Sequence, residues 1–147
     1  MDERQQLHFR LTNGLLPAAR QWQRLVQERL GHHGISSACI GPFMFIGRSD
    51  GGLHQVMLAQ QLGIEGPSLV RLLDKLAAAG LVRRESDAKD RRANHLWLTE
   101  AGRRLHRKLE QGLIALREEV LGDLSDTELQ AALKLCGLIE RAVARGS

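Results

Sequence analysis

The sequence predicts a mainly α-helical fold with one small β-hairpin, and three observations support this. Leucines recur every three or four residues, most clearly at positions 69, 72, 73 and 76, as in a helix with one buried face. Two short helical segments are separated by a tight turn that contains Gly63, which is typical of a helix-turn-helix. The alternation of apolar and polar residues over 93–98 then predicts a strand.

Length and composition limit the classes of function. The 147 residues, 43% hydrophobic and 26% charged, suffice for one globular domain or at most two small ones. The net charge of +4 permits a polyanionic partner. Aromatic residues are only 3% and tyrosine is absent, which argues against a platform that stacks the bases of a single strand.

The sequence also predicts where the protein works. No apolar run reaches the roughly 18 to 20 residues that a membrane span requires, so we expect no membrane partner. The first residues are polar and show no signal-peptide pattern. The two cysteines, Cys39 and Cys136, lie too far apart for a CxxC pair, so we expect a reduced, cytoplasmic protein.

The N-terminal segment, 1–47, is expected to be helical but interrupted. Residues 7–30 carry a leucine-rich apolar set, and Pro17 predicts a loose arm or kinked helix before a firmer helix that begins near it. The following apolar helix, 35–47, contains Gly41-Pro42, so we expect it to be kinked or split.

The middle segment, 48–98, contains the helix-turn-helix. Its first helix is expected over 55–62 and ends at Gly63. Pro67 suits the first turn of the second helix, and Gly80 suits the position just past its end.

A β-hairpin is expected next, with strands over 81–85 and 93–98 joined by a charged loop, 86–92. Leu96 and Leu98 alternate with His95 and Trp97, which fits one strand face on the core. A helix-turn-helix followed by such a hairpin is a winged helix.

The C-terminal segment, 99–147, is expected to be helical. Thr99 is a plausible N-cap of a long helix, and the capping box of Ser125 and Glu128 opens the last one. The last helix carries an apolar stripe that we expect to be buried: Ala132, Cys136, Ile139 and Val143.

The second helix of the motif has a polar face opposite its leucines, formed by Ser68, Arg71 and Lys75 at i, i+3 and i+7. Residues 66–92 hold seven basic and four acidic side chains, so most of the excess charge lies here. A helix fits the major groove, where arginine pairs with guanine, and a thin basic loop fits the minor groove. A solvated face explains each arginine singly, but the set on a helix-turn-helix favours binding of double-stranded DNA.

Four segments in order resemble the MarR (multiple antibiotic resistance regulator) family: 58–76 (LAQQLGIEGPSLVRLLDKL), 80–84 (GLVRR), 90–93 (DRRA) and 98–102 (LTEAG). The run from Pro67 to Arg71 is most similar to the SlyA branch. The resemblance covers about residues 53–102, and it implies a homodimer, formed by the N- and C-terminal helices, that binds a palindromic operator with two winged helices.

The resemblance also implies roles for single residues. Ser68 and Arg71 would face the major groove and Arg91 the minor groove, while Arg92 would support the wing or touch phosphate. The expected DNA-binding set is Ser68, Arg71, Lys75, Lys89, Arg91 and Arg92. Two features depart from the family: His54 replaces the Thr or Ser that usually caps the first helix of the motif, and Gly41-Pro42 interrupts a helix that is usually continuous.

Many family members release DNA when a small phenolic or lipophilic acid binds between the dimerisation helices and the winged helix. The resemblance points to Arg20 and Trp22 as pocket residues, with Met44 and Phe45 as an apolar wall. Arg20 could pair with a carboxylate. The alternative is that Trp22, Met44 and Phe45 only pack in the core and that Arg20 is a surface residue. This alternative is slightly favoured over a role in the pocket for each residue.

No other pattern indicates chemistry. Neither cysteine has a basic sequence neighbour to activate its thiol, so we expect both to be buried and inert. His32-His33 complete no recognisable set of metal ligands, and we expect no cofactor. No nucleophile motif, paired-carboxylate pattern or phosphate loop is present, so we expect no enzyme.

We therefore expect a transcriptional regulator of the MarR family, a repressor that binds DNA as a homodimer and is released by a small molecule. The rival is a winged-helix module that binds protein instead of DNA. The basic loop containing Lys89, Arg91 and Arg92 favours DNA, since a wing that docks on protein has no need of paired arginines.

Overall fold

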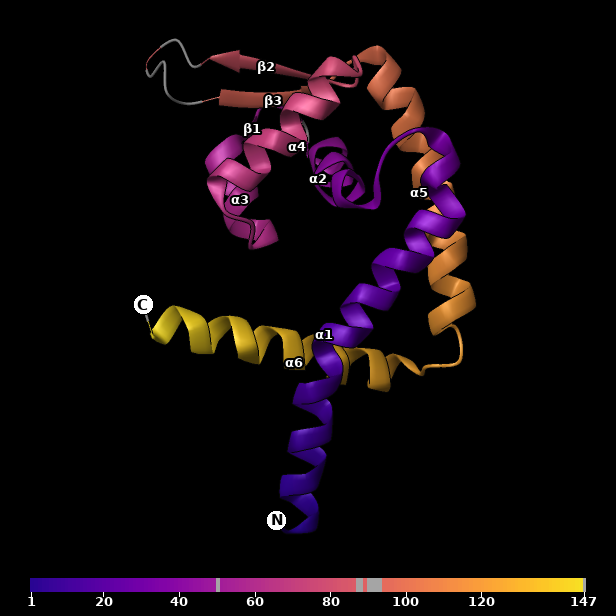
Figure 1. Cartoon of the computed structure of the whole chain (residues 1–147), viewed down its shortest axis with the longest axis vertical. Helices are drawn as coiled ribbons and strands as arrows, with labels where there is room; N and C mark the ends of the chain where they lie inside the picture. Colours follow the sequence, from indigo (N-terminus) through magenta and orange to yellow (C-terminus); the bar gives the residue numbers. More distant parts are fainter. Residues whose placement is uncertain (50, 87–88, 90–93, 147) are drawn as a thin grey trace. The chain divides into compact units, whose positions relative to one another are not determined.

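The computed structural model describes residues 1–49, 51–86, 89 and 94–146. The chain divides into two compact units, Met1–Leu113 and Ile114–Ser147. The helical protein with a small antiparallel sheet that the sequence predicts is confirmed (Figure 1).

The first unit contains most of the elements, in the order α1 (Glu3–Leu30), a 3-10 turn (Gly31–His33), α2 (Ser37–Arg48), β1 (Leu53–His54), α3 (Gln55–Leu62), α4 (Gly66–Ala78), β2 (Val82–Ser86) and β3 (Asn94–Leu98). The long helix α5 (Glu100–Leu121) begins in this unit and ends in the second, which also contains α6 (Asp126–Arg145).

Helix α1 begins at Glu3 and continues to Leu30. Of the two alternatives for the residues before Pro17, a loose arm or a kinked helix, the loose arm is wrong, because a capping box holds the first turn: the Gln5 backbone N–H donates to Asp2 Oδ1 at 2.8 Å, and the Asp2 N–H donates to Gln5 Oε1 at 2.9 Å. Pro17 lies inside the helix and removes only the hydrogen bond to the carbonyl of Asn13, an exposed residue.

Helix α2 is not split at Gly41-Pro42, so of the two alternatives, kinked or split, the split is wrong. The carbonyl that Pro42 leaves without a helical partner belongs to Ala38, which is exposed. Burial of the neighbouring side chains favours the continuous helix, since Phe43 and Ile46 are almost completely buried. The Gln27 side chain of α1 accepts a hydrogen bond from the Ser37 N–H at 2.8 Å, at an N-terminus that Ser36 does not cap.

The helix-turn-helix is confirmed. Gly63 adopts the left-handed conformation, with φ of 63°, and its N–H donates to carbonyls at the end of α3. Leu58 of α3 and Leu69 and Leu73 of α4 are completely buried. The two helices therefore share one core, and α2 packs against both.

The sheet has the order β1-β3-β2 and is antiparallel throughout. The predicted hairpin pairs β2 with β3, from Val82 opposite Leu98 to Ser86 opposite Asn94. The sequence did not predict β1, whose two residues are too few for any periodicity to be visible.

The end of α4 is tied to the sheet and to α5. Gly80, with φ of 74°, lets the Leu81 N–H return to the Leu76 carbonyl at 3.0 Å. The Leu81 carbonyl then accepts from the Thr99 N–H at 3.1 Å. Gly102 of α5 packs so closely on this carbonyl that a β-carbon there would collide with it.

In the second unit, the predicted capping box of Ser125 and Glu128 is confirmed and opens α6. The predicted burial of the α6 stripe is not seen in the single chain, where Cys136, Ile139 and Val143 are exposed. Among the described residues, no helix is both long and apolar enough to cross a membrane.

Gly102→Ala should lower the free energy of unfolding by about 1–3 kcal/mol, because the added methyl group meets the Leu81 backbone and the helix must shift. Gly14→Ala is the matched control. It lies in an exposed stretch of α1 with open space around it, and it should stabilise by about 0.5–1 kcal/mol. Urea unfolding at one protein concentration measures both changes, and equal effects would contradict this packing.

Candidate nucleic-acid interface

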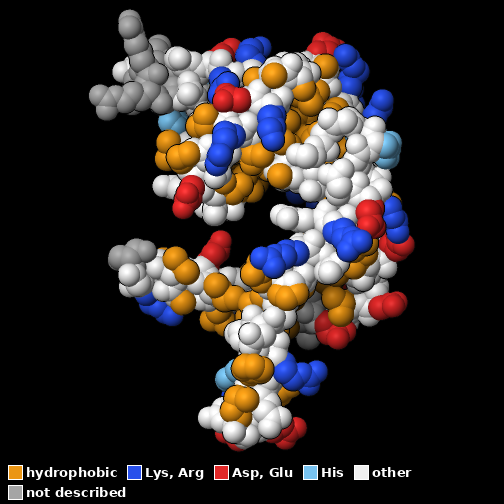
Figure 2. Space-filling model, viewed as in Figure 1, with side chains coloured by type: hydrophobic (Ala, Val, Ile, Leu, Met, Phe, Trp, Pro, Cys, Tyr) orange, Lys and Arg blue, Asp and Glu red, His pale blue; other side chains and the backbone are white. Residues whose placement is uncertain are grey.

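The burial of α4 determines which of its side chains are presented to solvent. Leu69, Leu73 and Leu76 face the core, and the opposite side carries Arg71 and Lys75, both exposed. Together with half-buried Ser68, these two residues line one shallow hollow, as their spacing predicts. Lys and Arg side chains stand among apolar ones over the α4 region in Figure 2.

The charges on this face are not equivalent. Neither Arg71 nor Lys75 forms an ion pair or hydrogen bond with a described residue. Asp74, between them in sequence, pairs with Arg84 of β2 at 2.7 Å between Oδ1 and Nη2. The pair offsets the negative charge on the face, and it joins α4 to the hairpin.

Sequence reasoning did not identify the pair of Asp74 and Arg84. The only available signal was opposite charge, and the contact depends on the left-handed turn at Gly80, which returns the chain along the helix. Both side chains are partly solvent-exposed, so the pair contributes at most about 1 kcal/mol to stability. Its main effect is to position α4 relative to β2.

The wing is the hairpin of β2 and β3, and at its base Arg83 contacts an acidic side chain and an aromatic ring. Arg83 Nε lies 3.0 Å from Glu85 Oε1, and the guanidinium lies 5.7 Å from the centre of the Trp97 ring. Lys89 is exposed. Arg91 and Arg92, the two wing residues expected to meet DNA, lie outside the described residues.

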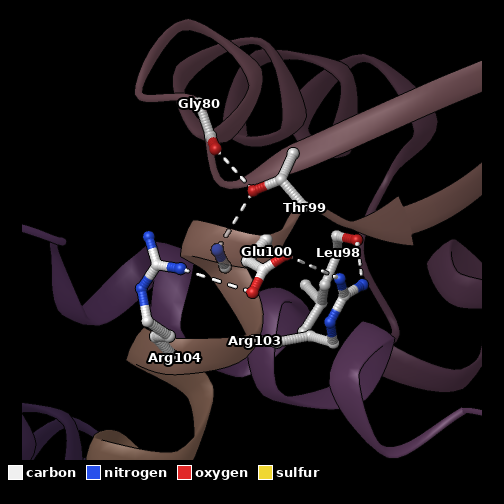
Figure 3. A network of polar contacts seen from close by, with 7 residues as sticks. Gly80, Leu98, Thr99, Glu100, Arg103 and Arg104 are labelled. Atoms are coloured by element: carbon white, nitrogen blue, oxygen red, sulfur yellow. Dashed lines mark hydrogen bonds and ion pairs between the residues drawn. The ribbon is translucent and has the colours of Figure 1, made fainter.

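Thr99 connects three elements, as Figure 3 shows. Its Oγ1 donates to the Gly80 carbonyl at 2.6 Å and accepts from the Gly102 N–H at 3.0 Å. The predicted N-cap of α5 is therefore confirmed. Arg103 adds a donor to the Leu98 carbonyl at 3.2 Å, so the start of α5 is fixed to the end of β3.

A sequence profile of the MarR family matches residues 33–93. The solved structure of transcriptional regulator PA3341 is 32% identical and covers 92% of this chain and 98% of its own, with a TM-score of 0.80. The transcriptional regulator BldR from Sulfolobus solfataricus is 25% identical, covers 96% of this chain and 99% of its own, and has a TM-score of 0.81.

The chain belongs to the MarR family. The fold alone also matches the structure of S. aureus MepR in complex with DNA, which is 21% identical, covers 88% of this chain and 96% of its own, and has a TM-score of 0.77. The protein is a MarR-family transcriptional regulator, which agrees with the expectation that it is not an enzyme.

One departure from the MarR pattern has a visible consequence. His54 makes no side-chain hydrogen bond to the start of α3, so the usual cap is missing. Its ring instead lies 4.9 Å from that of His95, its partner across β1 and β3, and His95 Nδ1 lies 2.8 Å from the Gly52 carbonyl oxygen.

The four residues expected in a MarR effector pocket differ in burial. Met44 is buried, Trp22 and Phe45 are half-buried, and Arg20 is exposed. Two hollows beside α2 are lined by none of these four: one is lined by residues of its C-terminal end and β3, the other by residues of its N-terminal end and α4. The role of Arg20, Trp22, Met44 and Phe45 in binding an effector stays a prediction.

The cysteines and the His32-His33 pair, which were considered for redox chemistry and metal binding, do not form a common site. Cys39 is buried, as expected, whereas Cys136 is exposed in the single chain, so the prediction of burial is wrong there. The rings of His32 and His33 lie tilted to one another with centres 4.0 Å apart. Partial burial, with the charges of His32 and Lys108, lowers the pKa of His33. Among the described residues, no three His, Cys, Asp or Glu side chains are grouped to hold a metal ion.

Thr99→Val should lower the free energy of unfolding by about 1–2 kcal/mol, because it keeps the shape but removes the hydroxyl that bonds Gly80 and Gly102. Thr99→Ser keeps the hydroxyl and should remain close to wild type. Chemical unfolding at fixed protein concentration separates them. A valine variant as stable as the serine variant would show that the hydroxyl does not hold this junction.

Proposed function

We propose that the protein binds double-stranded DNA with α4 in the major groove. The observation that carries the proposal is that exposed Arg71 and Lys75 lie beside half-buried Ser68 on the outer side of a helix held by buried leucines. Unpaired arginine and lysine side chains on such a helix attract phosphate, and arginine can pair with both acceptors of guanine. The DNA complex of the MarR-fold protein MepR supports the same use of the fold.

The protein acts as a homodimer in this proposal. Helix α1 exposes the large apolar side chains Leu7, Phe9, Leu11 and Leu16, and α6 exposes Leu133, Leu138, Ile139 and Val143. So many large apolar side chains left exposed on two helices favour an interaction site, and a second copy would cover the same residues on both chains. The two recognition helices of a dimer then read two half-sites, which makes the operator palindromic.

The wing and the regulation complete the proposal. Arg91 reaches the minor groove, Arg92 and Lys89 support the wing or meet phosphate, and the protein represses by occupying its operator in the cytoplasm. A small aromatic or lipophilic acid releases it, with Arg20, Trp22, Met44 and Phe45 as candidate contacts. The run from Pro67 to Arg71 supports placement in the SlyA branch.

Arg71→Ala should weaken operator binding by about 1–3 kcal/mol and relax the preference at one base position, since this side chain lies exposed on α4. Arg91→Ala should weaken binding to all duplexes more evenly and reduce the salt slope by about one. Binding to operator and to scrambled duplex across a salt series measures both effects. Arg107→Ala, an exposed arginine of α5, is the control and should change neither.

The two variants fail differently because a base contact changes the ratio of specific to non-specific affinity, whereas a phosphate or groove contact mainly changes counterion release. If Arg71→Ala and Arg91→Ala both bind operator and scrambled duplex like wild type, the helix and the wing are not the DNA-binding elements. The proposed function would then fail.

The dimer gives a separate prediction. Light scattering at micromolar concentration should give twice the 16.4 kDa mass of one chain. Val143→Glu places a charge among the exposed apolar side chains of α6 and should shift the protein toward the monomer. Val56→Glu, at an exposed position of α3, should leave the mass unchanged. A wild-type monomer at this concentration would contradict the dimer.

A further inference from the structure

We infer that Val70 of α4 reads the 5-methyl group of a thymine in the operator, next to the base that Arg71 contacts. This inference rests on the proposed function, since it needs α4 in the major groove. It adds a residue that selects an A·T pair beside one that favours guanine.

Val70 is the one large apolar side chain of α4 that is exposed, and the structure describes every residue of this helix. It is 37% exposed, whereas Leu69 and Leu73 on its core-facing side are completely buried. Val70 immediately precedes Arg71 and lies one turn before Asp74, both of which are exposed. It therefore stands at the margin of the proposed DNA-facing surface.

The surroundings of Val70 are apolar and open. It lines a shallow hollow whose other walls include Val56 and Ala59 of α3 and the turn from Gly63 to Gly66. A second hollow, lined in part by Ser68, Arg71 and Lys75, lies on the other flank of the helix and does not include Val70. A partner that meets both flanks must offer an apolar group near Val70 and acceptors near Arg71.

The major groove offers this combination. Thymine is the only base with a methyl group on its major-groove edge, and guanine presents two acceptors there. A valine side chain has no hydrogen-bonding atom, so it discriminates through contact and burial alone. Its single preferred rotamer in a helix holds the two methyl groups in place before DNA arrives.

Helix propensity does not favour valine at this position, since alanine and leucine are better helix formers. The 37% of Val70 that stays exposed gains nothing from the core and is available to a partner. A polar or alanine residue would serve an exposed helical position at least as well. Contact with a ligand accounts for an apolar, branched side chain here.

The test removes the methyl group from the DNA and the side chain from the protein. An operator is first selected from a random duplex library with the full-length protein, and each thymine is then replaced singly by deoxyuridine. At one position of each half-site the replacement should weaken wild-type binding about fourfold, the effect of one buried methyl group. Replacement in both half-sites should weaken binding about fifteenfold.

Val70→Ala should bind the thymine and deoxyuridine operators equally, because the contact partner is gone. Val120→Ala is the matched control, since Val120 is 44% exposed on α5 and does not line the hollow beside Val70, and it should keep the wild-type sensitivity. Circular dichroism melting confirms that each variant is folded. Arg71→Ala should also keep the sensitivity, which separates the methyl contact from the guanine contact.

Two results would overturn the inference. One is a wild-type protein that is indifferent to every deoxyuridine. The other is a Val70→Ala variant that keeps full sensitivity, which would assign the methyl contact to another exposed side chain such as Pro67. A wild-type protein that selects no duplex at all would overturn the proposed function itself, so the two failures are distinguishable.

Discussion

The burial of Leu69, Leu73 and Leu76 in α4 is the constraint on which the candidate interface depends. Leu69 and Leu73 have no exposed surface, and Leu76 has almost none, so α4 cannot rotate without moving apolar side chains into water. Ser68, Arg71 and Lys75 are thereby held on the outer side of the helix. The leucines bind nothing themselves, but they determine which residues are available to a partner.

The second constraint is the junction after α4, where few atoms join several elements. Gly80 turns the chain, Leu81 returns a hydrogen bond to α4, and Thr99 bonds to Gly80 and starts α5. The ion pair of Asp74 and Arg84 adds a side-chain link between α4 and β2. These links hold α4 and the base of the wing in a fixed position relative to one another. A duplex that meets both elements in two adjacent grooves requires such a fixed geometry.

The sequence predicted the features that rest on local chemistry. The α4 stripe, the turn at Gly63 and the caps at Thr99 and Ser125 each follow from residue types at fixed spacing, and they are confirmed. The early start of α1 was missed although the capping box of Asp2 and Gln5 is also a local pattern. The other failures arise where distant residues decide, since α2 continues through Pro42 because its neighbours are buried in the core. The two residues of β1 and the pairing of Asp74 with Arg84 depend on tertiary contacts that no local pattern contains.

The central claim is that α4 and the wing recognise particular duplex sequences. Sequencing the DNA fragments that the full-length protein retains from a sheared genomic library tests this most directly, because it presents every natural site at once. The account predicts a small set of enriched fragments that share an inverted repeat, with half-site centres about 10 base pairs apart or a multiple of that. Fragments that share no sequence would contradict it, and so would one asymmetric site without a repeat.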